Sequence, residues 1–204
     1  VDDTFACRPG KGTLAAVNRA QAHIRRFPWF VKTDVRAYFA SVDHGRLRGV
    51  LRRRFKDPGV LALCERILAR TPDPPGRGLP IGALTSQHFA NFYLDGADRR
   101  LLANPAVLAC VRYMDDMVWW CDSRAAVRAV RDDLAAWLAA ERGLALKPDV
   151  RIQRSGLGIA ASEPLDDFFV DPDYRNLIGA SRNGDHAVVV NLNTGREIAN
   201  IPMP

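Results

Sequence analysis

The sequence lacks the residue pairs that zinc sites and disulfide frameworks need. Its 204 residues include four cysteines, spread along the chain with no C-x-x-C pair, and four histidines, none at ligand spacing from a cysteine. This pattern argues against both kinds of site and favours reduced thiols. No apolar run approaches the length of a membrane span, and no signal peptide opens the chain. We therefore expect a soluble cytoplasmic protein with no membrane partner.

The chain is also poor in acidic residues relative to basic ones. It has 29 Lys and Arg against 23 Asp and Glu, a formal net charge of +6, and 48% of its residues are hydrophobic. Such a composition is typical of a folded domain, and the positive excess fits a polyanionic partner such as nucleic acid. Basic residues gather in "HGRLRGVLRRRFKD", which has helical apolar spacing. They form either a solvated helix face or a phosphate-contacting surface that includes Arg52 and Arg53.

Hydrophobic periodicity predicts a mixture of helices and strands. Helices are expected at residues 12–27, 44–55, 59–70, 83–102 and 123–143, and a strand is expected at 29–35. The stretch "VLACVRYMDDMVWWC" predicts a hairpin with two aspartates at its turn. "LALKPDVRIQ" predicts a short strand pair, and "HAVVVNL" with "REIANI" predicts a second hairpin.

Three aspartates carry the strongest chemical signal. Asp34 ends the predicted strand, and Asp115 and Asp116 occupy the hairpin turn. If strand and hairpin lie side by side, three carboxylates converge, and their mutual repulsion raises their pKa values. Divalent cations relieve this repulsion, and oxygen-only ligands favour Mg²⁺ or Mn²⁺. An Asp-Asp pair is also common at solvent-exposed turns, so the pair alone does not decide the matter.

Four ordered stretches extend this signal. They are "FACRPGKGTLAAVNRAQ", "FVKTDVRAYFASVDH", "GRGLPIGALTSQHFANFYLD" and "VRYMDDMVWW". Together they resemble the palm motifs of a reverse transcriptase, over roughly residues 4–159. The resemblance implies an α+β polymerase palm, an antiparallel sheet backed by helices, with part of the fingers. It also implies an RNA-directed DNA polymerase that transfers dNTPs to a primer 3′-hydroxyl with two Mg²⁺ ions, which Mn²⁺ can replace.

The resemblance assigns catalytic and metal-binding roles to matching positions. The implied metal ligands are Asp34, Asp115, their neighbour Asp116 and the backbone carbonyl of Val35. Phe39 matches the aromatic gate that rejects a ribose 2′-hydroxyl, and Tyr38 is the competing assignment. A core aromatic would explain Tyr38 equally well.

Further positions match residues that contact substrates in this family. Gly82 and Gln87, in "IGALTSQ", match the loop and helix start that touch the incoming nucleotide and template, although simple helix entry also explains them. Lys147 lies roughly where the family's lysine assists pyrophosphate departure, and an exposed strand-end lysine would look the same. Arg8 and Lys11 match positions near the template backbone, or belong to a solvated loop.

The resemblance also implies partners and a lineage. The partners are an RNA template, a DNA or RNA primer, dNTPs and an accessory protein of the retroelement. Group II intron and retron enzymes usually carry "QGxxxSP" where this chain has Ile81 and Gln87. These two residues look more like the enzymes of diversity-generating retroelements and related unclassified bacterial lineages.

The chain departs from the family pattern at both ends. It starts downstream of the family's fingers hairpin, and residues 160–204 match no thumb, so we expect a palm over 1–159 and a frame-broken tail of unknown role over 160–204. The alternative function is therefore an inactive palm remnant that binds nucleic acid without catalysis. A third is another palm nucleotidyltransferase, an RNA-dependent RNA polymerase or a cyclase. "YMDD" and the aromatic residue five positions after Asp34 argue against that third reading.

Overall fold

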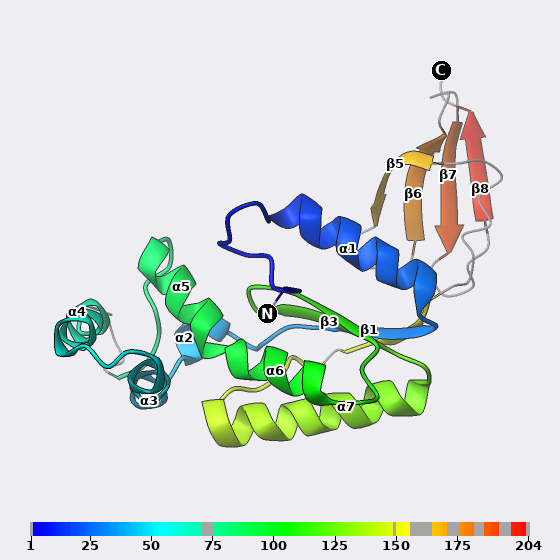
Figure 1. Ribbon diagram of the computed structural model, residues 1–204. Helices are drawn as coiled ribbons and strands as arrows, with labels where there is room; N and C mark the ends of the chain where they lie inside the picture. Colours follow the sequence, from blue (N-terminus) through cyan, green and yellow to red (C-terminus); the bar gives the residue numbers. More distant parts are fainter. Residues whose placement is uncertain are drawn as a thin grey trace. The chain divides into compact units, whose positions relative to one another are not determined.

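The computed structural model describes residues 2–70, 76–148, 150–155, 165–170, 176–181, 186–191 and 197–202 (Figure 1). The chain divides into two compact units, Val1–Ile152 and Gln153–Pro204. The helices of the first unit are α1 (Thr13–Arg26), α2 (Tyr38–Ser41), α3 (His44–Arg54), α4 (Pro58–Leu68), α5 (Leu84–Tyr93), α6 (Asp95–Ala103), α7 (Arg124–Trp137) and the π-helix η1 (Leu138–Arg142). Its strands are β1 (Trp29–Thr33), β2 (Ala109–Tyr113) and β3 (Asp116–Cys121), and β4 (Ile152–Arg154) begins at the unit boundary. The sheet order is β2-β3-β1-β4.

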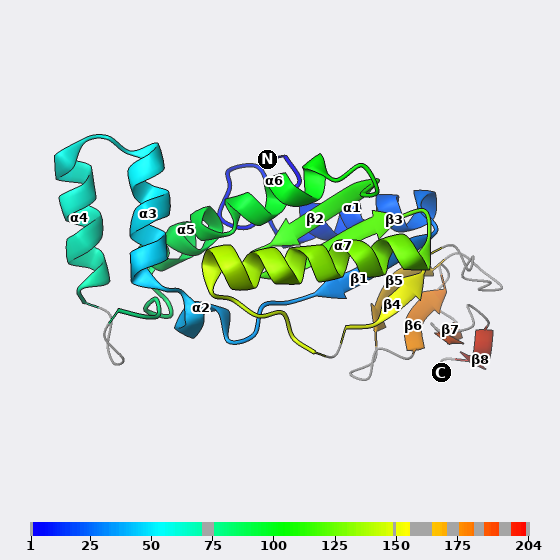
Figure 2. The ribbon, with the colours of Figure 1, turned by 90° about the horizontal axis from the view of Figure 1, so that it is seen from below.

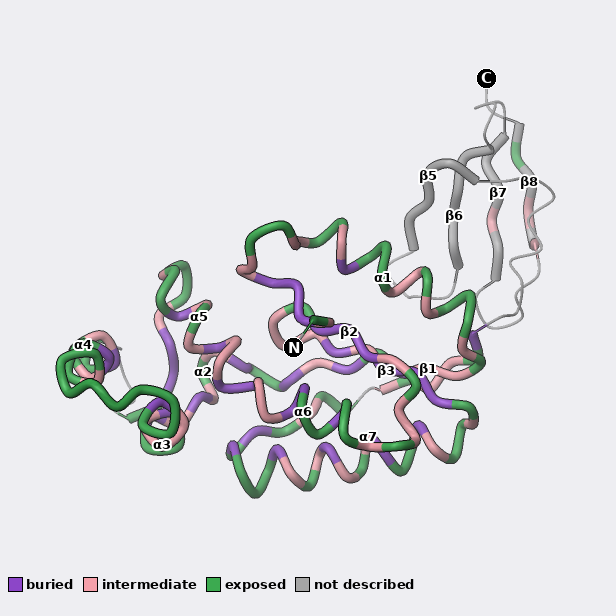
Figure 3. The backbone as a smooth tube through the Cα atoms, in the orientation of Figure 1, coloured by how far each residue is buried: buried purple, intermediate pink, exposed green. Residues whose placement is uncertain are grey.

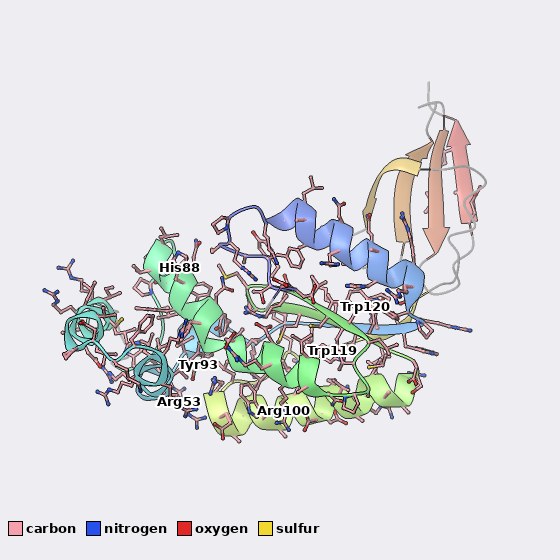
Figure 4. The ribbon with its side chains drawn as sticks, viewed as in Figure 1. Arg53, His88, Tyr93, Arg100, Trp119 and Trp120 are labelled. Carbon is pink, nitrogen blue, oxygen red and sulfur yellow. The ribbon has the colours of Figure 1, made fainter. Side chains whose placement is uncertain are left out.

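The central sheet carries a hydrophobic core on each face, because neighbouring residues of a strand point to opposite sides. Trp119 and Trp120 are both fully buried and lie in different cores. Trp119 packs with the apolar side of α7, while Trp120 packs with Phe5 and Ala16 (Figure 4). Figures 1 and 2 show α1 over one face of the sheet and α6 and α7 over the other. The predicted α+β palm, an antiparallel sheet backed by helices, is thereby confirmed.

Burial follows the strands rather than the helices (Figure 3). The central strand β3 is buried at four of its six positions, whereas α1 has one buried residue, Ala16. The predicted hairpin around the two aspartates is confirmed, with β2 and β3 paired in register from Ala109↔Trp120 to Tyr113↔Asp116. The first unit is therefore organised around β1, β2 and β3, which carry the candidate residues at their ends.

The single helix predicted over residues 83–102 is wrong. The structure has two helices, α5 and α6, which meet at Leu94. The break directly precedes Asp95-Gly96, two residues of low helix propensity. A Cβ atom on Gly96 would lie 2.7 Å from the Trp137 ring, so the glycine lets α6 approach the end of α7 closely. Gly96, two residues after the break, is therefore the position at which α6 packs against the end of α7.

The remaining expected helices are present. The one predicted over 123–143 appears as α7 followed by η1, and Gly143 ends it with a left-handed φ of 63°, as glycine does at helix C-termini. The short helix α2 was not predicted. Within the described residues, none of the helices combines the length and apolar character needed to cross a bilayer.

The second unit is a four-stranded antiparallel sheet. Its strands are β5 (Leu165–Val170), β6 (Asn176–Ser181), β7 (His186–Asn191) and β8 (Glu197–Pro202), in the order β5-β6-β7-β8. The pairing of β7 with β8 confirms the hairpin predicted from "HAVVVNL" and "REIANI". Each strand pairs with the next one in sequence, so this unit has its own local topology.

Gly96→Ala tests the close packing of α6 against α7. We expect this change to lower the free energy of unfolding by about 1–3 kcal/mol, because the new methyl group overpacks against the Trp137 ring. Gly49→Ala in α3 is the matched control, since a Cβ there meets nothing within 4 Å. It should instead stabilise the chain by about 0.5–1 kcal/mol through helix propensity. Urea unfolding of both variants measures the difference, and equal effects would contradict the packing argument.

Candidate active site

Two of the predicted carboxylates meet because β1 and β3 are antiparallel neighbours. Thr33 at the end of β1 pairs with Met117 near the start of β3. Asp34 follows β1 directly, and Asp115 lies in the two-residue turn that joins β2 to β3. The sheet register therefore places both carboxyl groups at the same end of the sheet, within hydrogen-bonding reach of each other.

The proximity of the two carboxyl groups perturbs Asp115. Its pKa is raised to about 6, first because burial disfavours its charged form and then because its protonated form can donate a hydrogen bond to the Asp34 carboxylate. The charges of Asp34 and Asp116 act in the same direction. The Oδ1 atom of Asp34 is buried and, among the described atoms, has no hydrogen-bond partner. This end of the sheet thus carries clustered carboxyl groups, and one carboxylate oxygen is available as a ligand atom.

Two lysines supply part of the missing positive charge. The ammonium group of Lys147 donates to Oδ2 of Asp34, and this contact raises the pKa of Lys147. The backbone N–H of Lys147 also donates to the Asp34 carbonyl at 2.9 Å, so the lysine is held here by the main chain as well. Asp116 pairs instead with Lys32, whose Nζ lies 3.1 Å from its Oδ1. The structure therefore brings Asp34, Asp115 and Lys147 together, while Asp116 is engaged by Lys32.

The pair of carboxyl groups fits a divalent cation. Within the part of the chain that the structure describes, no three acidic, histidine or cysteine side chains form a ready-made metal cluster. Asp34 and Asp115 nevertheless present hard oxygen donors, one of them unpartnered, and a lysine ammonium already occupies the place of a compensating cation. Oxygen donors in this number suit Mg²⁺, which retains waters and substrate oxygens as its other ligands.

The two candidate gate residues lie in different environments. Tyr38 is 3% exposed, and its hydroxyl donates to the carbonyl of Ala90 at 2.6 Å, which makes it a core side chain. Phe39 is half-buried and packs its ring edge-on against Tyr38. Its partial exposure makes Phe39 the better candidate for a gate. Val35, the other candidate on this segment, is buried and forms a bridge with Leu146.

The candidate nucleotide and template residues lie around the start of α5. Gly82 is exposed and has a φ of 87°, a conformation that favours glycine. Gln87 is half-buried, and its Oε1 accepts a hydrogen bond from the Cys7 thiol at 2.9 Å. Lys11 donates to the carbonyl of Asp2 and lies over the Phe5 ring, and Arg8 donates to the carbonyl of Thr4. These hydrogen bonds therefore fix the N-terminal loop beside Gln87.

The positive charge of the chain is concentrated on the helical hairpin of α3 and α4. Residues 44–70 contain eight Lys and Arg against two Asp and Glu, an excess equal to the +6 of the whole chain. Arg48 and Arg52 pair with Glu65. Arg53, labelled in Figure 4, and Arg54 are both exposed, and no carboxylate in the described part of the chain forms an ion pair with either. This hairpin is the strongest candidate surface for a polyanion.

Sequence reasoning missed one buried group beside the turn. Arg112, three residues before Asp115, forms an ion pair with Asp98 in which both side chains are 4% exposed. The signal was an arginine within the apolar run "VLACVRYM", since a charged residue in a buried strand needs a partner. Its partner on α6 could not be identified from the sequence.

The family comparison agrees with this geometry. The model of the family described as "Reverse transcriptase (RNA-dependent DNA polymerase)" matches residues 2–149. The putative COX1/OXI3 intron 2 protein of Saccharomyces cerevisiae is 30% identical over 101 residues, 46% of this chain and 12% of that protein. An uncharacterised 91 kDa protein in the cob intron of Schizosaccharomyces pombe is 27% identical over 97 residues, again 12% of its length. The chain thus spans a small part of these relatives.

Two further similarities concern the fold and a short segment. The structure of apo telomerase from Candida tropicalis superposes with a TM-score of 0.58 at 10% identity, covering 96% of this chain and 37% of that one. Telomerase from Candida albicans, in complex with a fragment of telomeric RNA, gives 0.56 at 12% identity, covering 95% and 35%. Separately, dihydro-heme d1 dehydrogenase of Pseudomonas aeruginosa is 42% identical over 45 residues, 22% of this chain and 9% of that protein.

Asp115→Asn tests the cost of burying a charged carboxyl group beside Asp34 at the end of the sheet. Because the pKa of Asp115 in the folded chain is about 6, its ionisation disfavours the fold as the pH rises from about 4 through 6. In EDTA at pH 7 we expect the variant to be more stable than the parent by about 1 kcal/mol, allowing for solvent screening. The difference should shrink towards pH 4. Asp132→Asn, in an exposed pair with Arg131, is the control for urea unfolding, and a destabilised Asp115→Asn would refute the argument.

Proposed function

Because the chain belongs to the reverse transcriptase family, we propose that it carries the palm of an RNA-directed DNA polymerase that uses dNTPs on an RNA template. The observation that carries the proposal is the meeting of Asp34 and Asp115 at one end of an antiparallel sheet. In the reaction the primer 3′-oxygen bonds to the α-phosphorus of a dNTP, the α–β phosphate bond breaks, and pyrophosphate leaves. In this proposal the end of the sheet at Asp34 and Asp115 is where the primer 3′-hydroxyl and the dNTP would be brought together.

Asp34 and Asp115 are the residues that would hold two Mg²⁺ ions, or Mn²⁺ in their place, with Asp116 and the Val35 carbonyl as further candidates. Such ions lower the pKa of the primer hydroxyl and offset the charge that develops on the phosphates. The raised pKa of Asp115 beside Asp34 supports this proposal, because a bound cation would offset the cost of charging both carboxyl groups.

The other site residues act on the nucleotide directly. The Phe39 ring would form the wall against which a ribose 2′-hydroxyl collides, with Tyr38 fixing that ring from the core. Lys147 would leave Asp34 when metal binds and place its ammonium group near the departing pyrophosphate, as acid or counter-charge. Gly82 would let the backbone approach the nucleotide, and Gln87, oriented by Cys7, would contact the nucleotide or template.

The nucleic acid itself would contact the basic residues. Arg52 and Arg53 on the α3–α4 hairpin are the main candidates, because the charge excess of the chain lies there. Arg8 and Lys11 contribute less to this proposal, since both side chains already contact the N-terminal loop. The telomerase complex with an RNA fragment supports an RNA partner by fold likeness alone.

We propose further that the polymerase belongs to a bacterial retroelement and works in the cytoplasm with a primer and an accessory protein. The bacterial assignment rests on Ile81 and Gln87, and the four free cysteines are compatible with the reducing cytoplasm. The matched fungal intron proteins are relatives of the same family, and their low identity leaves room for this assignment.

The second unit is proposed to be a module separate from the polymerase. The family match ends at residue 149, the chain divides after Ile152, and the four following strands form a sheet of their own. The alternative function is a palm remnant that binds nucleic acid without turnover, and the basic excess on the α3–α4 hairpin is the feature that it retains.

Primer extension on poly-rA/oligo-dT with Mg²⁺ or Mn²⁺ tests the proposed catalysis. Asp115→Asn should abolish dTTP incorporation, a loss of at least about 100-fold, because it removes one of two carboxylates at the reacting phosphate. Asp132→Asn, far from the turn in sequence and exposed, should retain full incorporation. Incorporation that survives Asp115→Asn would refute the proposal. A folded wild-type chain that binds RNA but incorporates nothing would support the remnant instead.

RNA binding at several KCl concentrations tests the basic hairpin. For Arg53→Gln/Arg54→Gln we expect weaker binding of a single-stranded RNA, and a salt slope that is smaller by about 1.4, at about 0.7 for each lost phosphate contact. Arg124→Gln/Arg128→Gln on α7 removes the same charge from another exposed surface and should change the slope much less. Equal losses in the two variants would mean that only net charge matters. Fluorescence anisotropy gives both affinities and slopes.

A further inference from the structure

The side chain of Arg112 has no donor left for a ligand. A guanidinium group carries five N–H bonds, and acceptors are present for all five. Nε donates to Oδ1 of Asp98 at 2.6 Å, and Nη2 donates to Oδ2 of Asp98 at 2.7 Å and to the Asn91 carbonyl at 3.3 Å. Nη1 donates to Oδ1 of Asn91 at 3.0 Å and to the carbonyl of Met114 at 2.7 Å.

This network joins the catalytic turn to three other segments. Asp98 also accepts from the Thr4 hydroxyl at 3.2 Å, and the Asn91 amide donates to the Ala6 carbonyl at 2.9 Å. The main chain of Arg112 exchanges hydrogen bonds with the N-terminal segment through Asp3 and Phe5. The N-terminal loop, α5 and α6 therefore all fix one guanidinium group, and that group holds the turn.

The residue held by Arg112 has an unfavourable backbone conformation. Met114 has a φ of 55°, a left-handed backbone conformation that residues other than glycine rarely adopt. It is the first of the two residues between Tyr113 and Asp116, and the second, Asp115, does not have a positive φ. A positive φ at the first position alone is the pattern of a type II′ turn, where glycine is favoured. A strained residue directly before Asp115 persists because its surroundings fix it.

We propose that Arg112 is a positioning residue, which holds the Met114 carbonyl so that the strained turn presents Asp115 to Asp34. Asp98 neutralises and orients the guanidinium group, and Asn91 completes the plane of acceptors. A cavity of about 270 Å³ lies beside this network, but with all five N–H bonds satisfied Arg112 offers no donor to a molecule bound there. The arginine therefore acts on the turn rather than on a ligand.

The inference rests on the proposed function for what Asp115 does, and its test separates the two. Asp98→Leu/Arg112→Leu replaces the buried ion pair by apolar groups, which such sites often tolerate. Adding Met114→Gly gives a turn that adopts the positive φ without the hydrogen bond. Arg100→Leu/Asp133→Leu is the matched control, because this bidentate pair joins α6 to α7 on the surface and does not touch the turn (Figure 4).

The measurements are the affinity for Mn²⁺ alone and the hydrogen exchange of the Asp115 and Asp116 amides, both on chains shown to be folded. We expect the Asp98/Arg112 variant to bind Mn²⁺ about tenfold more weakly, as loss of outer-shell support does, and its turn amides to exchange faster. Met114→Gly should restore most of both losses, which a merely structural role of the ion pair would not permit. The control pair should change neither quantity.

Two results would overturn the inference. One is a folded Asp98/Arg112 variant with the Mn²⁺ affinity and turn exchange of the parent, and the other is a loss that Met114→Gly does not restore. Should the apolar pair fail to fold, Arg112→Lys keeps the charge opposite Asp98 without the planar fork, and the same comparison applies. If the parent shows no Mn²⁺ binding that depends on Asp115, the proposed function fails at the metal site, while amide exchange still decides the role of Arg112.

Discussion

The cost of charging Asp115 beside Asp34 is the constraint to which the rest of the site responds. Antiparallel pairing of β1 with β3 sets these two carboxyl groups at one end of the sheet, and burial first, then the neighbouring carboxyl groups, raises the pKa of Asp115. A fold selected for stability alone would place an apolar or amide side chain at one of these positions. The chain instead keeps both acids, and it places Lys147 on Asp34 and Lys32 on the neighbouring Asp116.

Two kinds of positive charge serve this site in different ways. Lys147 and Lys32 are exposed and contact the aspartates directly, so they can move when another cation arrives. Arg112 is buried, its charge is neutralised by Asp98, and its contact with the site is a hydrogen bond to a backbone carbonyl. The lysines adjust the charge of the site, whereas the arginine fixes its shape. A flexible lysine in place of Arg112 would hold the turn less firmly. A buried arginine in place of Lys147 could not move away from Asp34.

Local signals in the sequence were sufficient for most elements of the first unit and for the positions of the candidate aspartates, but α2, β5 and β6 were not predicted. Alternation through "VLACVRYMDDMVWWC" gave the hairpin, and helical spacing gave α1, α3, α4 and α7. The break at Leu94 escaped prediction because the apolar period continues through it. The close approach of Trp137, 41 positions after Gly96, favours a glycine at that position, and this contact cannot be recognised from the local sequence. Long-range partners of this kind also hid the Arg112 network. Asp98 and Thr4 lie 14 and 108 residues from Arg112, and nothing local in the sequence pairs them.

The net positive charge of the chain lies on the α3–α4 hairpin, whereas the candidate catalytic carboxyl groups lie at the end of the sheet. Since the α3–α4 hairpin alone carries the excess of +6, the remaining residues, including the sheet and its carboxylates, are neutral in sum. A polyanion approaching the protein is therefore attracted to the hairpin first, by a field that salt screens. The acidic end of the sheet would repel the same phosphates until cations neutralise it. In the proposed function, nucleic-acid binding and phosphoryl transfer would therefore depend on different residues, and a chain that had lost the acidic pair would still bind.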